Sequence, residues 1–226
     1  MHAPSESASL ARVMDGDHWP LQGGFVSPEP LFEPASANLL LWRRARRSGF
    51  RPLFRWLVQS GWGHGTVEGI KPAIGELVPR APAALNGLRR ELERDIAKLV
   101  GLFRRHSGAV AIRIKLDIER TDRCRFFHSD NVGLRLLCTY DGPATEWVPD
   151  HAVLRHRLGG GGNDGVLLDP TAVERLHPWW VGLFKGDAYP GFFGQGCVHR
   201  SPPIERRRVT RILLTIDSPH DSGMEA

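Results

Sequence analysis

The spacing of apolar residues changes abruptly at Gly108, and this change constrains the fold more than any other feature. Before it, residues 84–107 place leucine, isoleucine and phenylalanine at every third or fourth position, which is typical of an amphipathic helix. After it, residues 109–120 (AVAIRIKLDIER) alternate apolar with mostly polar side chains, which predicts a half-buried strand. The chain therefore combines a long helix with a sheet.

Further strands are predicted in the C-terminal half. Residues 132–140 (VGLRLLCTY) form one strand. The segments GQGCVHRSPP and VTRILLTID form a strand pair joined by the turn IERRR. Because strands dominate after Gly108 and helices before it, we expect an α+β protein whose N-terminal helices cover a β-rich C-terminal half.

The N-terminal half is less regular. Residues 1–37 are rich in Pro, Ser, Ala and Glu, which predicts an extended chain. Residues 37–61 have helical spacing that Pro52 interrupts. A basic run in this segment is interpreted first as a solvated helix face and second as a phosphate contact. It consists of Arg43, Arg44, Arg46 and Arg47.

Length and composition set the number of domains. The chain has 226 residues, of which 41% are hydrophobic and 24% charged, enough for one well-buried core plus an accessory region. We divide it into an N-terminal extended and helical region at 1–80, a helix and β core at 81–218, and a disordered tail at 219–226.

Compartment and partners follow from what the sequence contains. No apolar window approaches the roughly 18 residues of a membrane span, and the N-terminus has no signal-like apolar core. The three cysteines, an odd number without CxxC spacing, indicate reduced thiols. They are Cys124, Cys138 and Cys197. We expect a cytoplasmic protein without membrane contact, whose net charge of +5 permits acidic partners.

Two histidines and one aspartate form the candidate metal site. His128 and Asp130 are two residues apart in FFHSDN, so on an extended segment they point to the same side. His199 follows 71 residues later on another predicted strand. Two imidazoles and one carboxylate on one face of an ion leave the opposite face open, as in non-haem Fe(II) sites. The same set also suits zinc.

The segments around these residues carry a family resemblance. HSDN, VGLRLLCTY, GPATEW, KGDAYPG, GQGCVHR and RILLTI, in this order, resemble the Fe(II)/2-oxoglutarate-dependent dioxygenases of the prolyl hydroxylase-like branch. More narrowly, the chain resembles the uncharacterised bacterial family called domain of unknown function 1826. The broader resemblance implies a double-stranded β-helix, a jelly-roll or cupin-like fold. It also implies that bound Fe(II) is chelated by the keto-acid end of 2-oxoglutarate.

The resemblance further implies that a basic residue pairs the distal carboxylate of 2-oxoglutarate. Arg208 and Arg211 lie nine and twelve residues after His199, and both offsets fit the superfamily. We favour Arg211, because it begins a continuous apolar run, where a buried guanidinium needs an anionic partner. Tyr140, which shares strand parity with Leu136, could donate its hydroxyl to the same carboxylate.

Four more residues could orient the ligands or face the substrate. They are Asn131, Glu146, Arg200 and Ser201, each adjacent to a metal-site residue or within the GPATEW segment. Glu146 also has an ordinary structural interpretation, as a hydrogen-bond acceptor. Taken singly, so do the metal-site residues: His128 and Asp130 as a turn in which Asp130 caps the backbone, and His199 as a strand histidine.

The sequence therefore predicts an Fe(II)- and 2-oxoglutarate-dependent oxygenase, a hydroxylase or demethylase acting on a small molecule or protein. The alternative is a non-catalytic, cupin-like protein that binds zinc or another divalent ion in metal homeostasis. A nucleic-acid partner is compatible with the basic run but is not favoured.

Overall fold

The computed structural model describes residues 32–218. The predicted extended chain before residue 32 and the predicted tail after residue 218 lie outside the described residues. No helix in the described part is both long enough and apolar enough to cross a membrane.

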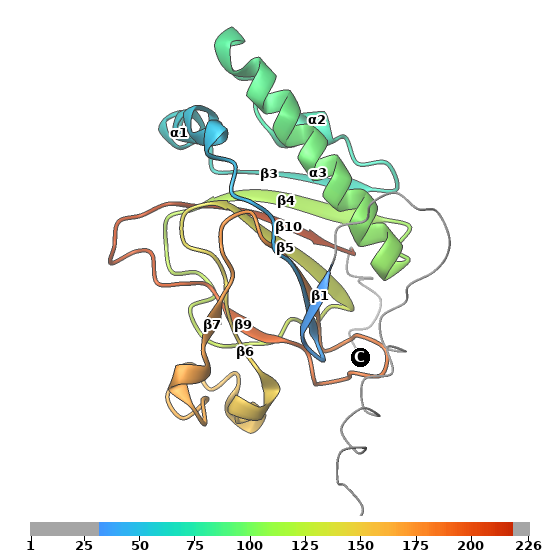
Figure 1. Ribbon diagram of the computed structural model, residues 1–226, viewed down its shortest axis with the longest axis vertical. Coiled ribbons are helices and arrows are strands. Elements are labelled where there is room, and N and C mark those ends of the chain that lie inside the picture. The colour runs from blue at the N-terminus through green and yellow to red at the C-terminus, as the bar shows by residue number, and fades with distance from the viewer. Residues whose placement is uncertain (1–31, 219–226) are drawn as a thin grey trace, which may run out of the picture.

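A seven-stranded antiparallel sheet dominates the fold (Figure 1), with strand order β1-β2-β8-β5-β10-β4-β3. Its strands are β1 (Glu33–Ser36), β2 (Leu39–Trp42), β3 (His64–Gly69), β4 (Ile112–Glu119), β5 (Leu134–Asp141), β8 (Val181–Lys185) and β10 (Arg211–Asp217). A smaller antiparallel sheet has the order β7-β6-β9. It consists of β6 (Glu146–Val148), β7 (Glu174–Arg175) and β9 (Val198–Arg200). The protein is thus a mixed α+β structure.

Helices cover one face of the large sheet (Figure 1). They are α1 (Arg51–Gln59), α2 (Ile74–Leu77) and α3 (Asn86–Ser107). Five short 3-10 helices lie at Ser48–Phe50, Ala83–Leu85, Asp150–Ala152, Arg155–Arg157 and Pro170–Ala172. The main core forms between α3 and the sheet, where Leu92 and Ile96 pack with Ile114 of β4. Burial of these apolar side chains is what holds the helices to the sheet.

The small sheet lies on the opposite face. A second apolar cluster joins Leu137 of β5 and Leu213 of β10 to Trp147 of β6. The large sheet therefore has an outer face under the helices and an inner face toward the small sheet (Figure 1). Side chains alternate between the two faces along each strand.

The switch at Gly108 is confirmed. Helix α3 ends where Gly108 adopts a left-handed conformation with φ of 66°, and its N–H donates to the carbonyl of Arg104 at 2.9 Å. Glycine is favoured there because it has no Cβ to clash in that conformation. The strand that follows, β4, alternates buried and half-buried residues along its whole length.

Three local predictions are wrong. Residues 37–61 are not one helix: β2 occupies the first part, and α1 begins at Arg51, with Pro52 in its first turn. Proline is tolerated there because the first N–H groups of a helix have no partner within it. The part before Gly108, which was expected to supply helices, also contains β3, which pairs with β4. The segments around His199 and Arg211 do not pair, because β9 pairs with β6, whereas β10 lies between β5 and β4.

The region before residue 80 is therefore more than a helical cover. It supplies β1, β2 and β3, and all three are hydrogen-bonded into the same sheet as the later strands.

Candidate metal centre

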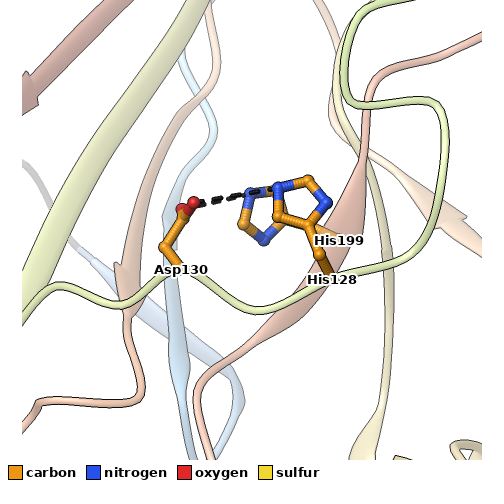
Figure 2. A group of neighbouring side chains, drawn as sticks. All are labelled: His128, Asp130 and His199. Carbon is orange, nitrogen blue, oxygen red and sulfur yellow. Dashed lines mark ion pairs between the residues drawn. The ribbon is translucent and has the colours of Figure 1, made fainter. Parts of the chain in front are cut away.

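The structure brings His128, Asp130 and His199 together (Figure 2), with one ligand atom from each lying within 4.8 Å of the others. His199 is the middle residue of β9, and His128 precedes β5. The two histidines form an isolated antiparallel bridge, in which each backbone N–H donates to the other carbonyl at 3.0 and 2.9 Å. Backbone pairing thus places two imidazoles from distant segments side by side.

Hydrogen bonds orient both imidazoles. Nδ1 of His128 lies 2.9 Å from the carbonyl oxygen of Phe126, and Nδ1 of His199 lies 3.0 Å from that of Cys197. A carbonyl oxygen only accepts, so each Nδ1 carries the hydrogen and each Nε2 keeps its lone pair. Metal-binding histidines commonly show this arrangement, because the outer hydrogen bond sets the tautomer.

The carboxylate of Asp130 faces both Nε2 atoms. Its Oδ1 lies 3.7 Å from Nε2 of His128 and its Oδ2 lies 3.3 Å from Nε2 of His199. Oδ2 is buried and has no hydrogen-bond partner among the described residues, whereas Oδ1 is 2.6 Å from Nη1 of Arg135. A buried carboxylate oxygen that accepts no hydrogen bond is costly unless something else binds it. The three residues therefore fit a divalent cation.

The protonation states suit the same interpretation. Burial lowers the pKa of His128 below its ordinary value, and the nearby His199 adds to this effect. Burial alone would raise the pKa of Asp130, but His199 and His128 in their protonated forms, together with Arg135, outweigh it, so that pKa lies well below its usual range. A neutral imidazole and an ionised carboxylate are the forms that bind metals.

A turn at residues 185–187 supports the loop that carries Asp130. The backbone N–H of Asp187 donates to the carbonyl of Asp130 at 2.7 Å, and the Ser129 hydroxyl donates to Oδ2 of Asp187 at 2.5 Å. Gly186 lies so close that a Cβ there would be 2.1 Å from the carbonyl oxygen of Val132. Only glycine permits this approach, so the KGD turn positions the metal loop.

The metal centre opens into a pocket of about 540 Å³ over the inner face of the large sheet. Its walls include the three metal-site residues, and Arg200, Ser201 and Arg211 also line it. The volume is within the ordinary range of small-ligand sites.

Arg211 is the buried cation of this pocket, with 1% of its surface exposed. Its Nη2 donates to Oγ1 of Thr145 at 2.6 Å, and its Nη1 donates to Oγ of Ser201 at 3.2 Å. Nη1 also lies 3.3 Å from Oε2 of Glu119, while Nε has no partner among the described residues. Burial lowers the pKa of Arg211, and Glu119 opposes that shift. The guanidinium thus has donor capacity that the described residues do not use.

Three predicted residues do not reach the pocket. Tyr140 lies on the outer face of the sheet, and its hydroxyl donates to Oδ2 of Asp95 on α3 at 2.8 Å. Its parity with Leu136 was correctly read, but that parity directs it toward the helices. Arg208 is exposed in a turn at φ of 49°. Asn131 is exposed. None of the three lines the pocket.

Glu146 and Arg200 form part of the pocket's support. The buried Glu146 accepts from Nε of Arg200 at 2.8 Å and from Arg175. The Arg200 guanidinium also stacks on the ring of Phe127, 4.2 Å from its centroid. Arg200 lines the pocket, whereas Glu146 lies behind it and holds it in place.

The sequence analysis did not identify several residues that line the pocket, because their position depends on the order of strands in the sheet. Besides Arg211, charged side chains of β4, β5 and β10 line the inner face. They are Arg113, Lys115, Asp117, Glu119, Arg135 and Asp217. In the sequence they resemble the solvent face of a strand. Their one distinguishing signal is the mixture of both charge signs at alternate positions.

The basic run near residue 45 is neutralised by neighbouring acids. Its four arginines each form an ion pair with a carboxylate. The pairs are Arg43–Glu33, Arg44–Asp95, Arg46–Asp141 and Arg47–Glu91. This pairing supports the interpretation of the run as a structural surface rather than a phosphate contact.

Comparisons with known proteins identify the family. No curated protein matches the sequence. Among solved structures, a bsmA homologue from Methylobium petroleophilum is similar at 14% identity and a TM-score of 0.35, over 69% of each chain. A family described as "Protein of unknown function (DUF1826)" matches residues 31–217. Because this match covers most of the chain, the protein belongs to the DUF1826 family.

Proposed function

We propose that this protein is a cytoplasmic Fe(II)- and 2-oxoglutarate-dependent oxygenase built on a double-stranded β-helix. The observation that carries the proposal is a single pocket that contains both the His128, Asp130 and His199 triad and the buried Arg211. A metal site alone would suit many proteins. A buried guanidinium in the same pocket suits a small anionic cosubstrate that also reaches the metal.

The three metal-site residues would hold Fe(II) through the two Nε2 atoms and the free oxygen of Asp130. Bound Fe(II) would supply the oxidising chemistry: oxygen and 2-oxoglutarate give succinate and carbon dioxide, and one oxygen atom goes to the substrate. The transfer to a C–H bond is a hydroxylation, and on an N-methyl group it leads to demethylation. The protein's own residues bind and orient the reactants and exclude water.

Arg211 would pair the distal carboxylate of 2-oxoglutarate. Its unused Nε and its Nη atoms offer a planar set of donors, and the hydroxyls of Ser201 and Thr145 hold the guanidinium in position. Glu119 is the one competing carboxylate that pairs with it. Because burial raises the pKa of Glu119, this acid is a weaker competitor than an exposed glutamate would be.

Anaerobic titration tests the proposal. The metal-free protein is titrated with Fe(II) and then with 2-oxoglutarate, and the weak visible charge-transfer band of a chelated keto acid is followed. We expect a band in the wild type that disappears in His199→Ala and persists in His156→Ala, whose histidine is exposed and lies outside the pocket. Tight zinc binding without any band would instead support the non-catalytic, metal-homeostasis function.

A further inference from the structure

Two arginine-rich loops lie side by side at the edge of the metal pocket. The first follows β4 and the second precedes β10 (Figure 1). Oδ1 of Asp122 accepts from the backbone N–H groups of Ile204 and Glu205 at 2.7 and 2.8 Å, and the N–H of Ser201 donates to the carbonyl of Cys124 at 2.9 Å. These bonds hold the two loops together, and the six exposed arginines that the loops carry are here called the arginine patch. It consists of Arg120, Arg123, Arg125, Arg206, Arg207 and Arg208.

The arginine patch keeps an excess of positive charge, because the parts of its loops that carry the six arginines contain two carboxylates, Asp122 and Glu205. All six side chains are exposed, and within residues 32–218 none forms an ion pair with a carboxylate. The basic run near residue 45 is the opposite case, since each of its arginines has an acidic partner. A cluster of unpaired guanidinium groups attracts polyanions, and guanidinium is well matched to phosphate.

The patch is continuous with the metal pocket. A hollow of about 390 Å³ is lined by Arg125 and Arg206 of the patch and shares Arg200 and Ser201 with the metal pocket. A second hollow, of about 380 Å³, is lined by both Arg125 and His128. An anion bound to the patch therefore lies next to the entrance of the pocket.

The pocket itself distinguishes between kinds of polyanion. Its lining includes the carboxylates of Asp117, Glu119 and Asp217 besides that of Asp130. Each of these carboxylates is paired with a cation of the same face, and Arg211, whose Nε is unused, is assigned to 2-oxoglutarate. Among the described residues, the rest of the pocket therefore offers no unpaired cation to the side chain of an acidic peptide. A nucleotide fits both surfaces. Its charged phosphate suits the arginine patch, and its base, which is neutral and rich in hydrogen-bonding groups, suits the pocket.

We propose that the arginine patch binds the phosphate backbone of a single-stranded nucleic acid and that one of its bases enters the metal pocket. A single strand is required because a base inside a duplex cannot reach a recessed site. The proposal that nucleic acid binds here depends only on the arginine patch. The identification of the base as the substrate rests also on the proposed oxygenase function.

Fluorescence anisotropy tests the binding surface. The full chain is titrated into labelled single-stranded RNA and DNA of the same sequence, about 12 nucleotides long, at several salt concentrations. The test variant is Arg123→Ala/Arg206→Ala/Arg207→Ala. The control, Arg43→Ala/Arg46→Ala/Arg47→Ala, removes the same charge from the paired run. Circular dichroism and thermal melting establish that both variants fold.

We expect the test variant to lose affinity about tenfold or more. The slope of log Kd against log salt should fall by about 2, because each of the three lost phosphate contacts contributes about 0.7. The control should retain most of its affinity. Equal losses in the two variants, or no binding at low salt, would overturn the proposal. So would equal displacement by polyglutamate or by phosphatidylserine vesicles, which would indicate an acidic protein or a membrane. Comparison of the affinities for RNA and DNA shows which of the two nucleic acids the protein prefers.

Photocrosslinking tests where the base lies. A strand with a single 4-thiouridine should crosslink to the peptide that carries Phe126 and His128, next to the metal centre. Crosslinks confined to residues 206–208 would overturn base entry. Neither assay needs the metal, so nucleic-acid binding without a charge-transfer band would refute the oxygenase alone. A band without nucleic-acid binding would refute the arginine patch alone.

Discussion

Arg135 of β5 holds the carboxylate of Asp130, with Nη1 of the arginine 2.6 Å from Oδ1 of the aspartate. The same guanidinium contacts Oδ2 of Asp217 through Nη2 at 2.6 Å, and the other oxygen of Asp217 lies 3.1 Å from Arg113. A row of alternating charges thus runs from the metal centre across the inner face of the sheet. Because Oδ1 of Asp130 is occupied, Oδ2 is the oxygen left for a metal.

Removal of the Arg135 side chain should weaken metal binding without removing a ligand. In Arg135→Ala we expect roughly a 10- to 100-fold loss of affinity, because Asp130 loses the group that orients it. Calorimetric titration of the metal-free protein with zinc measures this directly. Arg113→Ala is the matched control, since it removes a guanidinium from the same row without touching Asp130. Equal affinity in wild type and Arg135→Ala would show that the contact does not orient the ligand.

Substitutions of Arg211 and Arg208 should differ in their effect on 2-oxoglutarate binding. In Arg211→Lys we expect the concentration of 2-oxoglutarate needed for half-maximal signal to rise by roughly 30-fold, about 2 kcal/mol, because a two-pronged pairing is lost. Metal affinity should be unchanged. Arg208→Ala should have no effect on either quantity, since Arg208 is exposed in a turn outside the pocket. An effect of Arg208→Ala alone would reverse the assignment.

Substitution of Glu119 should strengthen 2-oxoglutarate binding rather than weaken it. The Glu119 carboxylate lies 3.3 Å from Nη1 of Arg211 and would compete with the cosubstrate for it. In Glu119→Gln we expect 2-oxoglutarate to bind more tightly, by roughly tenfold or about 1.4 kcal/mol. Titration of the charge-transfer band measures the change. Weaker binding in this variant would mean that Glu119 positions Arg211 rather than competing for its partner.

Gly186 should be intolerant of a side chain. A Cβ at this position would lie 2.1 Å from the carbonyl oxygen of Val132 and 2.6 Å from that of Asp130. We expect Gly186→Ala to lower the free energy of unfolding by about 1–3 kcal/mol, typical of overpacking, and to weaken metal binding. Chemical denaturation measures the first effect.

Gly87→Ala is the control for that measurement. Gly87 is exposed in α3, with nothing within 4 Å of the added Cβ. This variant should be neutral or more stable by about 0.5–1 kcal/mol, because alanine favours a helix over glycine. A similar loss of stability in both variants would exclude a special role for Gly186.

The sequence determined the features that depend on short-range periodicity. The helix before Gly108 and the strands near residues 112–119 and 134–141 were readable because side chains repeat at 3.6 or at 2 residues along one segment. The spacing of His128 and Asp130 was equally local, and it made this loop the candidate site. Chemical type then suggested His199 as a partner, and the structure brings the three together.

Only the tertiary structure decided which face of each strand meets the helices and which meets the pocket. Periodicity groups Tyr140 with Leu136, but it does not say that this group lies under α3 while Arg135 lies beside the metal centre. The mixed charges of β4 resembled a solvent face until the small sheet enclosed them as pocket lining. The physical reason is that alternation along a strand is a local property, whereas the environment of each face depends on packing between segments distant in the sequence.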